Sequence, residues 1–157
     1  MKKRIGVALL AAVFGAAAPN PIVWEIQPVA KKALKPGERF DVRLVAQIES
    51  GWRLYSMTQM PEGPHATRIS LAEEQRFELA GAIQAEKPQI TWDEILDMRR
   101  LETYEDEAAF TLPLRVSRNA RAGTQKLLVN ASYQACNEKM CLPPRTVTLE
   151  LPVEVNR

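Results

Sequence analysis

Hydrophobic and polar residues alternate along most of this chain, and this period of two predicts β-strands. Between Arg39 and Ile48 every second residue is apolar, and Pro36-Gly37 supplies a turn just before the segment. Because successive side chains of a strand point to opposite faces, the pattern predicts a strand with one buried face. The same reasoning predicts further strands at residues 52–55, 66–71, 76–79, 108–116, 127–133 and 145–155.

One segment breaks the alternation. Residues 92–107 are rich in charged side chains, with Ile95 and Leu96 as isolated apolar positions. A short helix or a long charged loop is expected there, and long loops without regular structure are often functional. Six or seven strands at this spacing, with almost no helical period, predict an all-β fold of the sandwich type.

The N-terminus has the layout of a secretory signal peptide. Three basic residues, Lys2, Lys3 and Arg4, precede an apolar run over residues 5–18 that ends in small side chains. This run is shorter than the roughly 20 residues that a transmembrane helix needs. Residues 1–18 are therefore expected to be a signal peptide and residues 19–157 one mature domain. Cleavage is expected after Ala17, because a later cut would leave a proline beside it.

Removing the signal peptide changes the net charge. The chain has 21 Lys and Arg against 19 Asp and Glu, and three of the basic residues lie in the predicted signal. The mature domain is then slightly acidic, which removes electrostatic support for a nucleic-acid partner. Export also places the chain in an oxidising compartment, where cysteines can pair.

Four residues separate the two cysteines, Cys136 and Cys141, which lie between two predicted strands. A tight hairpin there would bring their Cα atoms within the roughly 4.4–6.8 Å that a disulfide requires. As a staple, so short a loop is worth only about 2 kcal/mol. As a redox pair, one thiolate would attack a partner disulfide and the other would resolve the intermediate. Lys139 would favour a thiolate and Glu138 would oppose it. The pattern alone gives the structural and the redox interpretations similar weight.

A metal site has less support. Two cysteines supply half of a tetrahedral zinc site, and the only histidine, His65, lies far away in sequence. Copper(I) held by Cys136, Cys141 and Met140 is a third interpretation, although a methionine in this place more often serves packing. We therefore expect neither a metal nor another cofactor.

The residues around the cysteines carry a family motif. It reads Tyr-Gln-x-Cys, a short loop, and Cys-x-Pro-Pro ahead of the last strand, and it is formed by Tyr133, Gln134, Cys136, Cys141, Pro143 and Pro144. This motif resembles that of the DsbD N-terminal domain family of periplasmic thiol:disulfide interchange proteins. Three further stretches match in order and rough spacing: the aromatic-rich residues 51–55, Trp92-Asp93-Glu94, and residues 110–114.

The resemblance implies an immunoglobulin-like β-sandwich with its active cysteines at one end, under a cap loop. Such domains relay reducing equivalents between proteins in the periplasm. The implied partners are thioredoxin-like periplasmic oxidoreductases and a membrane-embedded electron donor, with no nucleic acid and no small-molecule substrate. The implied activity is protein thiol–disulfide interchange, of the kind used in cytochrome c biogenesis.

The resemblance also assigns roles to residues. Cys141 would form mixed disulfides and Cys136 would resolve them. Asp93 and Glu94 would lie near the sulfur atoms and tune their pKa values. Ile95 and Leu96 would belong to the cap loop, with Ile95 in the place of a covering aromatic residue.

Two features depart from the family. The cysteine spacing is one residue shorter than in its best-known members, and neither a membrane domain nor a thioredoxin domain follows Arg157. The expectation is thus either a stand-alone relay domain with separately encoded partners or a domain whose task has drifted. The alternative is a secreted immunoglobulin-like binding module with a structural disulfide. Three aromatic residues, Trp52, Tyr55 and Phe110, are expected to be core residues.

Overall fold

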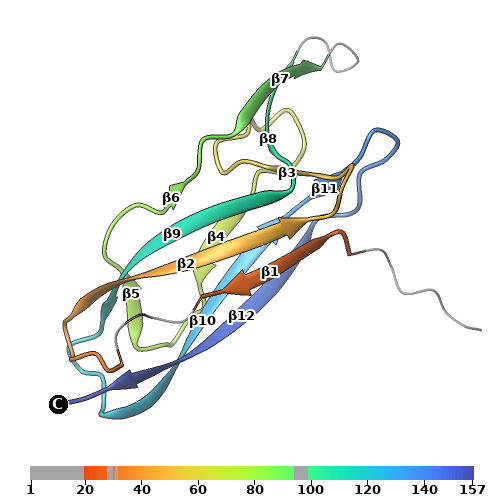
Figure 1. The fold of residues 1–157 in the computed structure, drawn as a ribbon. Coiled ribbons are helices and arrows are strands. Elements are labelled where there is room, and N and C mark those ends of the chain that lie inside the picture. The colour runs from red at the N-terminus through yellow and green to blue at the C-terminus, as the bar shows by residue number, and fades with distance from the viewer. Residues whose placement is uncertain (1–19, 28–29, 31, 94–98) are drawn as a thin grey trace, which may run out of the picture.

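The computed structural model describes residues 20–27, 30, 32–93 and 99–157. The predicted signal peptide lies outside these residues and stays a prediction. All regular structure in the described ranges is β-strand (Figure 1). These ranges accordingly contain no helix of the length and apolarity that crossing a membrane requires.

Within the described residues, twelve strands form three antiparallel sheets. The first sheet has the order β1 (Ile22–Ile26), β2 (Arg39–Ile48), β9 (Glu107–Val116) and β5 (Phe77–Leu79), and β6 (Gln84–Ala85) also pairs with β9. The second sheet has the order β12 (Arg145–Val155), β10 (Gly123–Tyr133) and β4 (Arg68–Leu71). The third, called the end sheet below, has the order β11 (Ala135–Cys136), β3 (Arg53–Tyr55), β8 (Arg99–Tyr104) and β7 (Gln89–Asp93).

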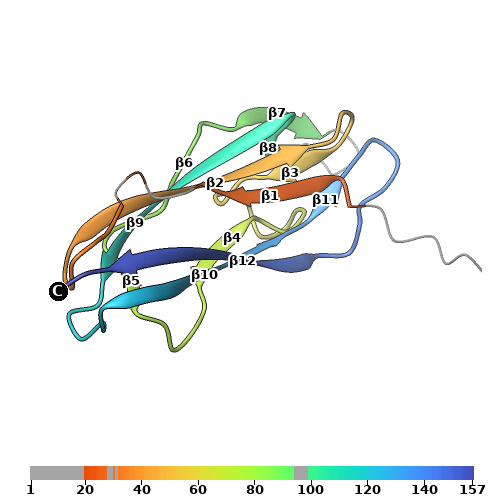
Figure 2. The same ribbon diagram turned by 60° about the horizontal axis from the view of Figure 1, so that its bottom comes forward.

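The first and second sheets are the two layers of a sandwich (Figure 2). Alternate residues of each strand point inward, as the period of two predicts. In β2 these are Val42, Leu44, Ala46 and Ile48, all buried, and β10 supplies a matching row. Each such Leu, Val or Ile stabilises the fold by about 1.5–3 kcal/mol relative to an exposed position. The apolar faces of the two layers therefore supply the main core.

The end sheet is built from continuations of both layers. β3 follows β2 and β8 leads into β9, so these two strands extend the first sheet. β11 follows β10 after the single residue Gln134, so it extends the second sheet. Pairing of β11 with β3 joins the two layers at one end of the sandwich. In Figure 1 this end lies opposite the C-terminus.

Aromatic rings fill the core next to the end sheet. Trp24 lies between Phe110 and Tyr133, with ring centroids 5.7 and 5.6 Å away. Tyr104 of β8 meets the edge of Phe110 at 6.0 Å. Since these four rings come from β1, β8, β9 and β10, they fix the end sheet to both layers.

Two glycine turns flank β2. The predicted Pro36-Gly37 turn is confirmed, because the Glu38 N–H donates to the Lys35 carbonyl at 3.0 Å and Gly37 has φ +82°. Gly51 has φ +81° in a second turn, which leads from β2 into the end sheet. A positive φ at this position is natural for glycine and strained for other residues.

The prediction of a helix or long loop over residues 92–107 was wrong for the described part of this segment, and residues 94–98 lie outside the described residues. This segment contains the end of β7, all of β8 and the start of β9. The alternation was hidden because Glu102 lies at a buried position, where hydrogen bonds satisfy its carboxylate. The strands predicted at 39–48 and 145–155 are confirmed with those bounds.

Candidate redox site

Cys136 and Cys141 form a disulfide at the sheet-joining end of the sandwich. Their Cα atoms are 4.0 Å apart, slightly less than the expected range. Cys136 is the last residue of β11 and pairs with Arg53 of β3, and the two cysteines also form an isolated antiparallel bridge. The fold therefore places the dithiol in a tight hairpin, as the sequence predicts.

Backbone hydrogen bonds fix the hairpin between the cysteines. The Asn137 side-chain oxygen accepts from the N–H groups of Lys139 and Met140 at 2.8 and 2.9 Å. The Asn137 N–H in turn donates to the Met140 carbonyl at 2.9 Å. An asparagine side chain can take the place of backbone in a turn in this way. Asn137 thus stabilises the loop with hydrogen bonds that add to the sulfur–sulfur bond.

Gln134 fastens the two sides of this hairpin to a neighbouring loop. Its amide nitrogen donates to the Leu142 carbonyl at 3.0 Å, and its amide oxygen accepts from the His65 N–H at 2.9 Å. His65, distant in sequence, is therefore close to the cysteine hairpin in space. The preceding Tyr133 is fully buried in the main core. Tyr133 thus anchors the hairpin to the main core, and Gln134 anchors it to the loop that contains His65.

The two cysteines differ sharply in exposure. Cys136 is 3% exposed and packs in a small apolar cluster with Tyr55 and Leu101, separate from the main core. Cys141 is exposed, in the loop that leads to β12. An incoming thiolate would meet Cys141 first, while Cys136 lies under an apolar cover.

Three comparisons with known proteins bear on this site. A family model described as "Thiol:disulfide interchange protein DsbD, N-terminal" matches residues 24–152. The chain belongs to this family. No curated protein sequence matches it.

Two solved structures resemble this DsbD N-terminal family member over most of its length. One is the Neisseria meningitidis DsbD N-terminal domain in the reduced form, with 18% identity, TM-score 0.54, and coverage of 85% of this chain and 86% of that one. The other is the complex between the DsbD N-terminal and PilB N-terminal domains of the same organism, with 20% identity, TM-score 0.51, and coverage of 82% and 80%. They support the fold: the immunoglobulin-like β-sandwich expected from the sequence is confirmed.

Of the four predicted cap residues of this DsbD N-terminal family member, only Asp93 lies within the described residues. Asp93 is the last residue of β7, opposite Arg99, and two strands of the end sheet lie between β7 and β11. Glu94, Ile95 and Leu96 lie outside the described residues. Their position near the sulfur atoms, and that of the Asp93 side chain, stays a prediction.

The expected aromatic core residues separate into two groups. Phe110 is fully buried and Trp52 packs half-buried against the main core, both as predicted. Tyr55 is also buried, but it belongs to the Cys136 cluster and is thus a residue of the site. Leu101, its other member, was missed because it lies in the charged segment whose strand was not recognised.

Arg53 is a further site residue that the sequence did not reveal. It lies opposite Cys136 in the β3–β11 register, and its Nε is 3.1 Å from a carboxylate oxygen of Glu105. A nearby cation favours a thiolate, and the paired carboxylate weakens this effect. The only earlier signal was its position in the aromatic 51–55 stretch.

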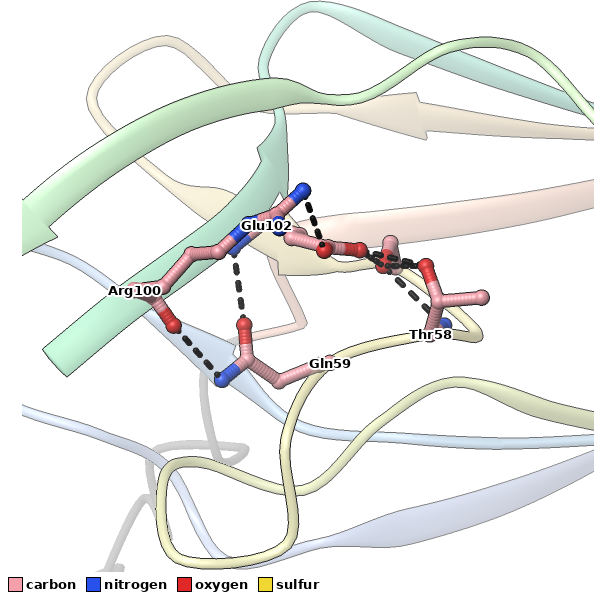
Figure 3. A network of polar contacts seen from close by, with 5 residues as sticks. Thr58, Gln59, Arg100 and Glu102 are labelled. Atoms are coloured by element: carbon pink, nitrogen blue, oxygen red, sulfur yellow. Dashed lines mark hydrogen bonds and ion pairs between the residues drawn. The ribbon is translucent and has the colours of Figure 1, made fainter.

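A polar network lies where the chain leaves β3 and turns against β8 (Figure 3). The Glu102 carboxylate accepts hydrogen bonds from the hydroxyls of Ser56, at 2.8 Å, and Thr58. Its other oxygen is 3.0 Å from Arg100 Nη2. The Thr58 hydrogen bond, supported by Ser56 and Arg100, lowers the pKa of Glu102, although burial acts in the opposite direction. The carboxylate is thus held in its charged form.

Gln59 completes this network, because its side chain forms hydrogen bonds with the β8 backbone as a neighbouring strand would. Its amide oxygen accepts from the Glu102 N–H at 2.8 Å, and its amide nitrogen donates to the Arg100 carbonyl at 3.4 Å (Figure 3). Both groups are backbone groups of β8 beyond the point where β3 has ended. Gln59 therefore satisfies an edge of β8 that would otherwise need another strand.

Proposed function

We propose that this chain is a periplasmic thiol–disulfide exchange domain that passes reducing equivalents between protein partners through Cys136 and Cys141. The observation that carries the proposal is the unequal exposure of the pair, in a member of a thiol:disulfide interchange family. Thiol exchange needs one sulfur that a partner can reach and a second that can displace that partner. Cys141 meets the first need and Cys136 the second.

Reduction of the domain takes two steps. A thiolate of the reduced donor attacks Cys141 Sγ, the sulfur–sulfur bond breaks, and Cys136 leaves as a thiolate that then takes up a proton. A second donor thiolate attacks the donor sulfur in the mixed disulfide and releases Cys141. The donor ends as a disulfide and this domain as a dithiol, so two electrons have moved.

Delivery to the next protein is the same sequence in reverse. The Cys141 thiolate attacks the acceptor disulfide, and the displaced acceptor thiolate is protonated. Cys136 then attacks Cys141 in the mixed disulfide and releases the reduced acceptor. In this scheme Asp93 and Glu94 tune the thiol pKa values, and Ile95 and Leu96 form part of the cap.

The partner classes follow from the family and from export. We assign thioredoxin-like periplasmic oxidoreductases and a membrane-embedded electron donor, with residues 1–18 as the signal peptide. A solved structure contains the complex between a DsbD N-terminal domain and a PilB N-terminal domain, which supports a protein partner. A domain with an exposed Cys141 offers such a partner direct access.

Trapping of mixed disulfides tests this division of roles. In Cys136→Ser, an accessible Cys141 has lost its resolving partner, so a complex with an oxidised thioredoxin-like protein should accumulate. The matched control is Cys141→Ser, whose remaining thiol is buried beneath Tyr55 and Leu101. We expect at least about tenfold more trapped complex for the first variant on non-reducing gels, since thiol exchange depends on access. Equal trapping would contradict the assignment of roles.

The competing function is a binding module with a merely structural disulfide. The hydrogen bonds of Asn137 and Gln134 already fix the hairpin, so a staple adds little to it. If neither cysteine variant formed a mixed disulfide with any oxidised thioredoxin-like protein, this second function would be favoured.

A further inference from the structure

The polar network around Glu102 and the apolar cover of Cys136 share their backbone. Tyr55 and Leu101 pack on Cys136, and the residue that follows each of them, Ser56 and Glu102, belongs to the network. Successive side chains on a strand point to opposite faces. The cover and the network are therefore opposite faces of the same short stretch of β3 and β8.

This stretch is where β3 and β8 begin to separate. Their register pairs are Leu54 with Tyr104 and Tyr55 with Thr103, and the Ser56 N–H still donates to the Glu102 carbonyl at 2.8 Å. Beyond that point, the hydrogen bonds between the two segments in the described residues all involve a side chain. We call this place, formed by the Glu102 network, the junction. The Glu102 carboxylate is its centre, because it accepts hydrogen bonds from the hydroxyls of Ser56 and Thr58.

The junction is partly buried and its groups are paired: Thr58 and Arg100 are exposed, whereas its other three members are buried. Ser56 is 1% exposed, Gln59 6% and Glu102 7%. Removal of the Glu102 side chain takes away the acceptor of the Ser56 and Thr58 hydroxyls. A buried polar group without a partner costs free energy, and this cost is relieved when the strands move apart and water enters. Loss of Glu102 should therefore loosen β3 from β8 at the level of Tyr55 and Leu101.

We propose that Glu102 is a positioning residue of the redox centre, which holds Tyr55 and Leu101 closed over Cys136 and thereby makes the disulfide harder to reduce. The proposal rests on the function proposed above and adds a residue that touches neither sulfur. An apolar cover disfavours a thiolate at Cys136, and a sulfur that is a poor thiolate is a poor leaving group. A tight cover thus slows attack on the disulfide and favours its oxidised form.

Reduction by dithiothreitol measures this effect without any protein partner. For Glu102→Ala we expect the second-order rate of disulfide reduction at pH 7 to rise by about threefold to tenfold, as water reaches Cys136. The equilibrium with a glutathione buffer should move toward the dithiol by a similar factor. Thr58→Ala removes one donor to Glu102 and should shift both quantities in the same direction by less.

A matched control separates positioning from general stability. Glu150→Ala removes a carboxylate that pairs with Lys126 at 2.8 Å across β12 and β10, two strands of the second sheet that are not part of the end sheet. It should leave the rate and the equilibrium unchanged. Circular dichroism verifies that each variant is folded, and Thr58→Ala decides the question if Glu102→Ala is not.

The proposal is overturned if folded Glu102→Ala, or Thr58→Ala in its place, is reduced at the wild-type rate and keeps the wild-type equilibrium. A lower melting temperature without either change would make Glu102 a structural residue only. Failure of the proposed function has a different signature: no mixed disulfide forms with a protein partner, whereas these small-thiol measurements do not depend on one.

Discussion

At the scale of single residues, Cys136 and Cys141 share one bond but have different surroundings. Tyr55 and Leu101 enclose Cys136, while Cys141 faces solvent beyond a loop that Asn137 shapes. Because Cys141 is accessible and Cys136 is buried, the first is suited to attack by a partner and the second to resolving the mixed disulfide. The same stretch of chain places a charged Glu102 one residue from the apolar cover.

Glu102 should make stability depend on pH. Its pKa is lowered in the folded state by the Thr58 hydroxyl first, then by Ser56 and the Arg100 guanidinium. A carboxyl with a lowered folded pKa stabilises the fold above its unfolded pKa, near 4.5, and this contribution is lost as pH falls.

The comparison of wild type with Glu102→Gln isolates this contribution. The difference between their free energies of unfolding, from urea titrations, should be largest at neutral pH and shrink at pH 3. A difference that stays constant, or grows on acidification, would contradict the assigned direction.

At the scale of elements, the alternating pattern predicted the strands of the sandwich and missed most of the end sheet. β2 and β12 have apolar residues on one face and polar ones on the other, so their bounds follow from the sequence. β8 buries Leu101, Glu102, Thr103 and Tyr104 in succession, because it is covered on both faces. Such a strand has no period of two, and its buried carboxylate mimics a solvent-exposed position.

The same limit applies to the candidate site. The two cysteines and their hairpin were predictable because they are neighbours in sequence. Tyr55, Leu101 and Arg53 reach Cys136 only through the pairing of β3 with β8 and β11. That pairing is a long-range contact, which no local pattern in the sequence encodes.

Phe110 tests how the core supports the end sheet. It is fully buried in β9 and contacts both Trp24 and Tyr104. Replacement by alanine leaves a cavity at this junction, and we expect a loss of about 3–5 kcal/mol in the free energy of unfolding. Val23→Ala, at a position 52% exposed on β1, is the control and should change it by less than about 0.5 kcal/mol. Similar losses for the two variants in a urea titration would contradict this account of the core.

At the scale of the whole molecule, the sandwich and the redox pair are separate in space and in their contribution to stability. The core between the two layers does not include Cys136, and the disulfide hairpin lies at the end away from the C-terminus (Figure 1). Closing so short a loop contributes only about 2 kcal/mol. The fold can thus persist with the pair oxidised or reduced, as a relay requires.

The measurement that tests the redox function most directly is the reduction potential of the Cys136–Cys141 pair. The wild-type protein is equilibrated with glutathione buffers of graded composition, and the fraction of dithiol is read after acid quenching and thiol alkylation. A relay pair should change between disulfide and dithiol at a potential above about −300 mV. A pair that stays fully oxidised across these buffers would be a structural disulfide and would contradict the account.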